Sequence, residues 1–198
     1  MSISLYDFII LLMMKNSLCG DLIENRKKIS KSEVLEKSEL IKNRLFEMKD
    51  FQQALTILFY VSYDNEVYTR DMIKESIKLG KNVIVPKSDK ENRKLILSKL
   101  NNWEDLVKGA YGILEPKEID PISIDKIDLI IVPGVGFDKQ GRRIGHGKGY
   151  YDNLLRNSKK TIHIGLAFEF QIVEKIPTEA HDVPVQKIIT EKRVIGCI

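Results

Sequence analysis

The chain has 198 residues, of which 43% are hydrophobic and 30% are charged, a composition typical of one soluble globular domain. Its formal charge of +4, from 32 basic and 28 acidic residues, suits a small anionic ligand. The basic residues form only short pairs such as Lys27–Lys28 and Arg142–Arg143, so the sequence argues against nucleic acid as a partner.

Residues 1–14 are predicted to form an N-terminal extension, and residues 15–198 a single domain. The apolar run Phe8–Met14 is too short to cross a bilayer, and a lysine follows it at once. No basic residue precedes the run, as a signal peptide would require. We therefore expect no membrane contact and a short helix whose apolar face packs on the body. An alternative is that translation begins at Met13 or Met14.

Two cysteines, Cys19 and Cys197, lie near opposite ends of the chain, and neither belongs to a CxxC motif or a metal-ligand spacing. This usage favours reduced thiols in a cytoplasmic protein over a disulfide that joins the two ends.

Helical and strand-like patterns alternate along the chain. Ser30 and Glu33 are spaced as a capping box between the first two helices, and Thr69 and Gly80 stand where a later helix begins and ends. The continuous apolar run 55–62 is typical of a strand covered on both faces. In chain order, the predicted elements are helices over residues 15–29 and 31–48, a strand over 55–62, a helix over 69–80, strands over 82–86 and 94–100, a short helical stretch around 103–108, a loop over 109–116, a strand over 128–133, a helix over 149–157, a strand over 162–168, and one or two strands over 187–198.

This alternation indicates a single-domain, three-layer α/β/α fold, Rossmann-like, with a mostly parallel sheet and helices on both faces. In such sheets ligands bind beyond the carboxyl ends of the strands. The segments that follow three of the predicted strands contain Glu66, Lys87 and a glycine-rich stretch at residues 141–155.

That stretch reads GRRIGHGKGYYDNLL, and in it Gly145, Gly147 and Gly149 alternate with larger residues. Glycines let backbone N–H groups approach an anion closely, and a helix that begins near Gly149 would add its N-terminal donors. Lys148 and Arg143 supply positive charge. The pattern is neither a Walker motif nor a GxGxxG directly after a strand, so it leaves a phosphate cradle and a flexible basic loop equally open.

Two aspartates bear on this choice. Asp152, one turn into the predicted helix, is placed either to bind magnesium near a phosphate or only to stabilise the helix dipole. Asp182, in the segment EAHDVP, is placed either as a second magnesium ligand or in an Asx turn together with His181.

The segment DLIIVPGVGFDKQGRRIGHGKGYYDNLL resembles the signature of the 5-formyltetrahydrofolate cyclo-ligases, also called methenyltetrahydrofolate synthetases. The resemblance extends over nearly everything from Lys15 to Glu191. The other segments that carry it, in the same order as in the family, are KNSLCGDLIENRKKIS, FYVSYDNEVYT, VIVPK, GAYGILEP and IGLAFEFQIVEKIPTEAHDVPVQKIITE.

This resemblance implies a monomeric enzyme of CoA-transferase-like fold that uses ATP and Mg²⁺. The enzyme would convert 5-formyltetrahydrofolate to 5,10-methenyltetrahydrofolate, giving ADP and phosphate, by phosphorylation of the formyl oxygen. Phosphoryl transfer is mostly positioning and charge neutralisation, which agrees with a site rich in donors and cations.

The resemblance also implies individual roles, of which those of Lys148, Arg143 and Tyr150 are catalytic. The residues expected to bind ATP are Lys15, Arg143, Gly145, His146, Gly147, Lys148, Gly149 and Tyr150. Those expected at the folate site are Val61, Glu66, Tyr111 and Tyr151, and those expected to bind Mg²⁺ are Asp152 and Asp182. Without the resemblance, Glu66 would be interpreted as a solvated acid in a loop.

Two positions depart from the family pattern. Cys19 stands where the family commonly has arginine, so a cation is missing at the phosphates unless Arg26 or Arg142 replaces it. His146 stands where relatives usually have tyrosine or arginine, and its protonation predicts a modest strengthening of ATP binding on the acid side. Two alternatives remain open: the same ATP chemistry on a different pterin or formyl-amine, and a catalytically silent relative that binds nucleotide or folate.

Overall fold

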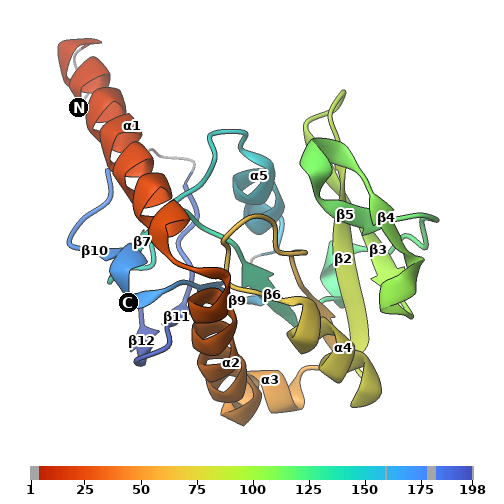
Figure 1. Ribbon diagram of the computed structural model, residues 1–198. Helices are drawn as coiled ribbons and strands as arrows, with labels where there is room; N and C mark the ends of the chain where they lie inside the picture. Colours follow the sequence, from red (N-terminus) through yellow and green to blue (C-terminus); the bar gives the residue numbers. More distant parts are fainter. Residues whose placement is uncertain (1–4, 159, 178–181, 198) are drawn as a thin grey trace.

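The computed structural model describes residues 5–158, 160–177 and 182–197, and within these ranges it is a mixed α/β structure (Figure 1). The helices are α1 (Leu5–Lys28), α2 (Lys31–Glu47), α3 (Lys49–Gln53), α4 (Arg70–Lys78) and α5 (Tyr150–Arg156), with short 3₁₀ turns at Trp103–Asp105, Ala110–Gly112, Ile124–Lys126 and Glu169–Gln171.

A seven-stranded sheet runs through the centre in the order β12-β11-β9-β6-β1-β2-β3. Its inner pairings, from β11 to β2, are all parallel, whereas β3 and β12 pair antiparallel at the two edges. The strands are β1 (Thr56–Leu58), β2 (Asn82–Asp89), β3 (Lys94–Leu100), β6 (Leu129–Val132), β9 (Ile162–Leu166), β11 (Lys187–Ile189) and β12 (Val194–Gly196). The mostly parallel sheet predicted from the sequence is confirmed.

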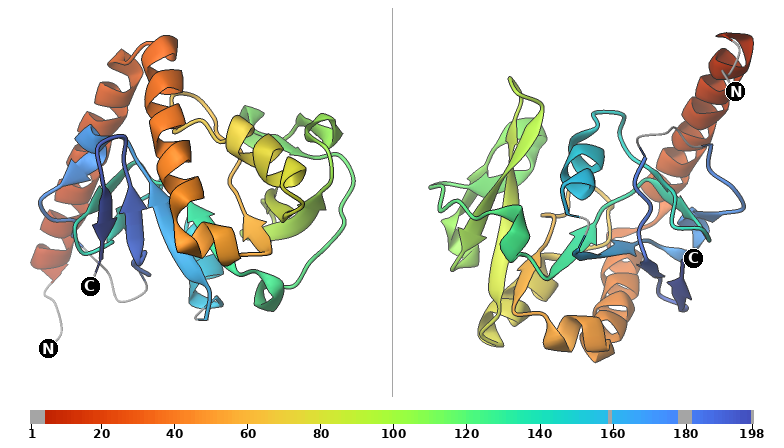
Figure 2. Two further views of the ribbon diagram at one scale, coloured as in Figure 1. Left: turned by 90° about the horizontal axis from the view of Figure 1, so that it is seen from below. Right: turned by 180° about the vertical axis from the view of Figure 1, so that it is seen from behind.

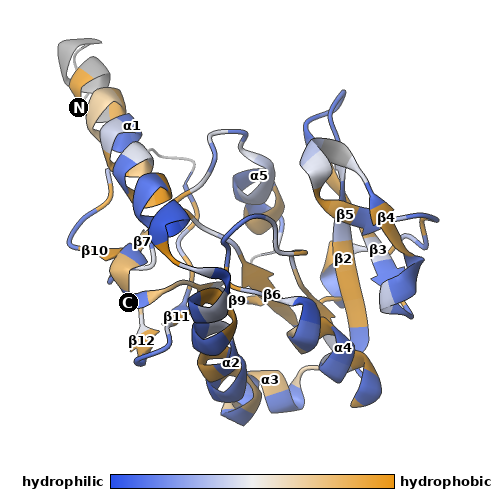
Figure 3. Ribbon diagram, in the orientation of Figure 1, coloured by the Kyte–Doolittle hydropathy of each residue, from blue (hydrophilic) through white to orange (hydrophobic). Residues whose placement is uncertain are grey.

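Helices cover both faces of this sheet, as Figure 2 shows from two sides. On one face, α2 buries Val34, Ile41 and Leu45, which recur at helical spacing, together with Phe51 of α3 and side chains of α4. On the other face, Leu155 of α5 packs against strand residues from β1, β2, β6 and β11. Inner strands such as β2 and β6 are hydrophobic in their central residues, while the outer faces of the helices are largely polar (Figure 3).

Two smaller sheets extend the fold, and the sequence did not predict them. One has the order β10-β7-β8 and consists of β10 (Ile172–Val173), β7 (Gly136–Asp138) and β8 (Arg143–Ile144). Helix α1 packs on it through Leu22, so closely that a Cβ on Gly136 would lie 2.5 Å from Leu22 Cδ1. The other is a hairpin of β4 (Leu106–Lys108) and β5 (Leu114–Pro116), in place of the helical end and loop predicted there.

The N-terminal segment is helical as expected, but the expectation that its apolar face packs on the body is wrong for Ile10 and Leu12–Met14. Residues 5–28 form one continuous helix, and Ile10, Leu12, Met13 and Met14 are between 40% and 67% exposed. Consecutive apolar residues point to all sides of a helix, and this end of α1 projects beyond the body (Figure 1). No described helix is both long and apolar enough to cross a membrane.

Local details correct two further predictions. The apolar run predicted as one strand forms only the three residues of β1, although Phe59, Tyr60 and Val61 beyond it remain buried. Thr69 occupies the N-cap position of α4 as predicted, but its side chain does not cap the helix, because its hydroxyl donates to Tyr60 O at 2.8 Å and accepts from the backbone N–H of Ser62.

Other local predictions hold. The capping box forms, with Ser30 Oγ accepting from the N–H of Glu33 and the Glu33 carboxylate accepting from the N–H of Ser30. Gly80 ends α4 with a left-handed φ of 77°. Both cysteines are free thiols.

Candidate functional site

The site lies where the strand order reverses. From β1 the chain continues to β2 on one side and later returns to β6 on the other side of β1. In open α/β sheets such a switch point leaves a crevice beyond the carboxyl ends of the strands. The segment after β1 contains Val61 and Glu66, and the segment after β6 leads through β7 and β8 to the glycine-rich stretch.

In the glycine-rich stretch, backbone conformation explains two of the glycines. Gly147 and Gly149 have φ values of 75° and 70°, in the left-handed region that favours glycine. Gly149 directly precedes α5, so its conformation turns the chain into that helix. Open space surrounds the Cβ position of both residues, so backbone angle rather than crowding selects glycine there.

Arg143 and Asp152 connect the stretch to α5. Arg143 Nη2 lies 2.5 Å from Asp152 Oδ1, and the Arg143 side chain is only 6% exposed. Its Nε is buried without a hydrogen-bond partner among the described residues. The predicted cation and the predicted magnesium ligand are thus paired with each other.

Helix α1 brings the second aspartate to the same place. Lys15 Nζ lies 3.2 Å from Asp182 Oδ2, and the thiol of Cys19, one turn further along, is 4.0 Å from Gly145 O. His181, the neighbour of Asp182 in the predicted turn, lies outside the described residues.

These two aspartates fit a magnesium ion that takes most of its ligands from phosphate and water. No group of three or more histidine, cysteine, aspartate or glutamate side chains in the described part of the chain could hold a metal ion by itself. Magnesium, however, usually keeps several waters and binds through one or two carboxylates plus phosphate oxygens. Asp152 and Asp182 are carboxylates of that kind.

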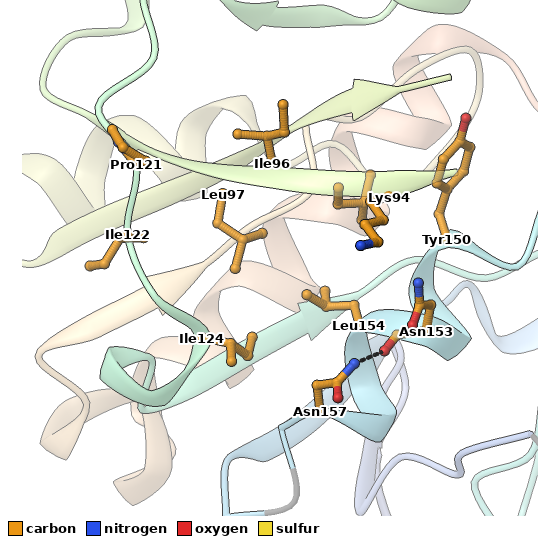
Figure 4. Close-up of a pocket in the computed structure, with 11 residues that line it drawn as sticks. Lys94, Ile96, Leu97, Pro121, Ile122, Ile124, Tyr150, Asn153, Leu154 and Asn157 are labelled. Atoms are coloured by element: carbon orange, nitrogen blue, oxygen red, sulfur yellow. Dashed lines mark hydrogen bonds between the residues drawn. The ribbon is translucent and has the colours of Figure 1, made fainter. Parts of the chain in front are cut away.

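Lys148, Tyr111 and Tyr150 meet at the outer end of the site. Lys148 Nζ lies 3.1 Å from the centroid of the Tyr111 ring, and Lys90 contacts the same ring at 4.6 Å. Hydrogen bonds with Lys148 and Tyr150 lower the pKa of Tyr111. Tyr150 also borders an apolar groove of about 450 Å³ between β3 and α5 (Figure 4).

Glu66 and Tyr151 form the inner end, where burial dominates. Glu66 Oε2 accepts from the N–H of Tyr63 at 3.0 Å, and burial raises the pKa of this carboxyl. Burial and then the charge of Glu66 raise the pKa of Tyr151, whose hydroxyl has no hydrogen-bond partner among the described residues. Val61, the remaining residue predicted here, is buried.

Arg26 joins this inner end, although the sequence pattern proposed it only as a substitute for a missing cation. Its Nη1 lies 3.9 Å from Glu66 Oε1, and its side chain is 4% exposed. Asn65 donates to the carbonyls of Arg26 and Ile29, which ties the loop that carries Glu66 to the end of α1. No motif in the sequence marks Asn65 for this role, since it is a contact across 36 to 39 residues.

The chain matches known proteins over most of its length. The model of the 5-formyltetrahydrofolate cyclo-ligase family matches residues 13–191. The 5-formyltetrahydrofolate cyclo-ligase of Mus musculus is 31% identical over 189 residues, covering 89% of this chain and 93% of that protein. The enzyme of the same name from Haemophilus influenzae is 35% identical over 144 residues, covering 70% and 76%.

Solved structures agree with this match. The 5,10-methenyltetrahydrofolate synthetase of Aquifex aeolicus superposes with a TM-score of 0.83 at 34% identity and covers 92% of both chains. The synthetase of Mycoplasma pneumoniae superposes with a TM-score of 0.73 at 26% identity, covering 89% of this chain and 98% of that one.

Proposed function

This chain belongs to the 5-formyltetrahydrofolate cyclo-ligase family, and from that premise we propose that it converts 5-formyltetrahydrofolate to 5,10-methenyltetrahydrofolate with ATP and Mg²⁺. The observation that carries the proposal is the position of the glycine-rich stretch. Its cation Arg143 lies over the Tyr151 ring, which neighbours the partly buried Glu66, so we infer that a phosphate donor and a polar heterocycle are held side by side.

The proposed reaction has two steps. The formyl oxygen attacks the γ-phosphorus of ATP, ADP leaves, and an iminium phosphate of the folate results. The neighbouring folate nitrogen then attacks the formyl carbon and loses its proton, the carbon–oxygen bond breaks, and phosphate leaves with the former formyl oxygen and takes up that proton as hydrogen phosphate. Phosphorylation is needed because an amide-like oxygen is a poor leaving group.

In the first step, the protein positions the phosphates and neutralises their charge. We assign the backbone of residues 145–149, with Lys148, Arg143 and Lys15, to the triphosphate, and Tyr150 to the same end of the site. Lys148 leaves the Tyr111 ring, and Arg143 and Lys15 share or release their aspartates, when phosphates enter. Asp152 and Asp182 would hold Mg²⁺, which supplies charge neutralisation at the phosphate oxygens.

The folate is assigned to the inner end. We assign Glu66, whose pKa burial raises above its ordinary value, to hydrogen-bond the pterin. Val61 supplies apolar wall, the Tyr151 hydroxyl offers an unused hydrogen bond, and the Tyr111 ring stands at the outer end. We further propose that the protein acts as a cytoplasmic monomer, with residues 15–198 as one domain.

One assay tests the reaction. Pure protein is mixed with 5-formyltetrahydrofolate, ATP and Mg²⁺, and the near-ultraviolet absorbance of the methenyl product is followed, with ATP omitted as the control. ATP-dependent appearance of the product is expected. Binding of ATP and folate without product would contradict the proposal and favour a silent binding protein, while turnover only with another formyl-amine would reassign the substrate.

A further inference from the structure

We propose that Arg26 contacts the phosphoryl group that is transferred from ATP, and so provides the cation that position 19 lacks in this chain. The inference rests on the proposed function and adds a residue to its site. It starts from the helix that carries both positions.

Seven residues make just under two turns of an α-helix, so positions 19 and 26 of α1 lie on the same face, about 10 Å apart along the axis. Helical side chains lean toward the N-terminus, so a long side chain at position 26 reaches back toward the turn that carries position 19. Cys19 is against Gly145 O at 4.0 Å, at the glycine-rich stretch. An arginine at position 26 therefore delivers its charge near the place where an arginine at position 19 would act.

The Arg26 guanidinium is buried but poorly bonded. Its Nε and Nη1 have no hydrogen-bond partner among the described residues, and the ion pair with Glu66 is long, at 3.9 Å. Burying a guanidinium without hydrogen bonds destabilises a fold. Such a group is explained if the ligand supplies the missing acceptors.

The other candidate cation is engaged elsewhere. Arg142 precedes β8 and pairs with the buried carboxylate of Asp138 at 3.8 Å, and its side chain is 34% exposed. The backbone N–H of Arg142 bonds the same aspartate. Arg142 thus serves the turn between β7 and β8 and does not replace the missing charge.

The neighbours of Arg26 locate its ligand at the junction of the two substrates. On the nucleotide side, burial and then the charge of Arg26 lower the pKa of His146, which belongs to the glycine-rich stretch. On the folate side, Arg26 faces Glu66. The group that lies between a triphosphate and a folate is the phosphoryl group in transfer, whose three oxygens carry negative charge throughout the step.

Arg26→Leu tests this, with Lys27→Leu as the matched control. Lys27 is the next residue on α1, with a side chain that is 56% exposed and paired with Glu24. We expect Arg26→Leu to lower kcat by roughly 10²- to 10³-fold, as for loss of one donor to a transition-state anion. Its Tm should change little, because removal of a poorly bonded guanidinium and the loss of the ion partner of Glu66 act in opposite directions. Lys27→Leu should keep the kcat of the unmodified protein.

A second variant and a binding measurement separate a ligand contact from a structural role. The double variant Cys19→Arg/Arg26→Leu should regain at least about tenfold in kcat over Arg26→Leu, because it restores the charge on the same helix face. Isothermal titration should show that Arg26→Leu weakens binding of a non-hydrolysable ATP analogue but not of ADP, which lacks the γ-phosphate.

Three results would overturn the inference: an unchanged kcat in Arg26→Leu, a loss of activity that follows a loss of Tm without recovery in the double variant, or equal weakening of ADP and the ATP analogue. Failure of the proposed function is distinct, since then the unmodified protein itself would form no methenyl product.

Discussion

The two ends of the candidate site differ in how their polar groups are satisfied. At the nucleotide end, as we assign it, Arg143 pairs with Asp152, Lys15 pairs with Asp182, and Lys148 lies on the Tyr111 ring, while Arg143 Nε alone has no hydrogen-bond partner among the described residues. At the end that we assign to the folate, the pairing is poorer: Arg26 lies 3.9 Å from Glu66, and Arg26 Nε and Nη1 and the Tyr151 hydroxyl have no hydrogen-bond partner among the described residues.

This difference indicates two ways to prepare for a ligand. The nucleotide end keeps its charges compensated, so ligand binding exchanges one set of contacts for another. The end that we assign to the folate carries buried polar groups with a desolvation cost, which a bound ligand would offset. Variants at the first end should therefore alter activity more than stability, and Glu66→Gln at the second should alter both in opposite directions.

The largest effect is expected at the nucleotide end. Lys148→Ala and Asp152→Ala should each lower kcat/KM for the methenyl product by about 10³-fold, because each removes a group that neutralises or organises phosphate charge. Lys139→Ala, an exposed lysine on the nearby turn, is the control and should be unaffected. Product formed at an undiminished rate by both variants would show that the site residues are wrongly assigned.

A moderate effect is expected at the folate end from Glu66→Gln. Glutamine retains an acceptor for the N–H of Tyr63 but loses the charge that faces Arg26, so activity should fall about 10- to 100-fold.

The stability of the same variant depends on pH in a defined direction. Burial raises the Glu66 pKa above its ordinary value of 4.5, against the opposing effects of the Tyr63 N–H and Arg26 and with a smaller contribution from Asp64. The charged carboxylate therefore destabilises the fold, and that penalty is absent below the ordinary pKa and complete above the raised one. The unfolding free energy of Glu66→Gln minus that of the unmodified protein should increase as pH rises from 4.5. A constant or falling difference would mean that the carboxylate is not desolvated.

The smallest effect concerns His146, which lies between the two ends. Burial, Arg26 and Lys148, in that order, lower its pKa below the ordinary 6.5, so the ring is neutral at physiological pH. His146→Gln is the reference, because protonation of ATP itself affects both proteins equally. Well below pH 6.5 the unmodified protein should bind ATP about fivefold more tightly than this variant, because the protonated ring adds one charge-assisted hydrogen bond. Titration calorimetry of both proteins across this range would detect it, and parallel affinity curves would contradict it.

The sequence predicted the elements whose signals are local. The helical spacing of apolar residues and the residues typical of helix ends identified α2, α4 and the capping box at Ser30. Apolar runs identified β6 and β9. The same reasoning overextended β1, because a buried apolar run does not specify how many residues find a strand partner. It also missed the three-stranded sheet around β7, since strands of two or three residues contain too little pattern to detect.

For the site, the sequence by itself determined the chemical groups: a glycine-rich stretch with cations, two aspartates and an acid after the first strand, recognisable because their spacing along the chain is constrained. Only the tertiary structure decided which of these groups pair with each other. It also decided that the buried Arg26 faces Glu66, on the helix in which position 19 carries no charge. The physical reason is that pairing and desolvation depend on contacts across 9 to 167 residues, and no local pattern encodes which cation meets which carboxylate or which donor remains without a partner.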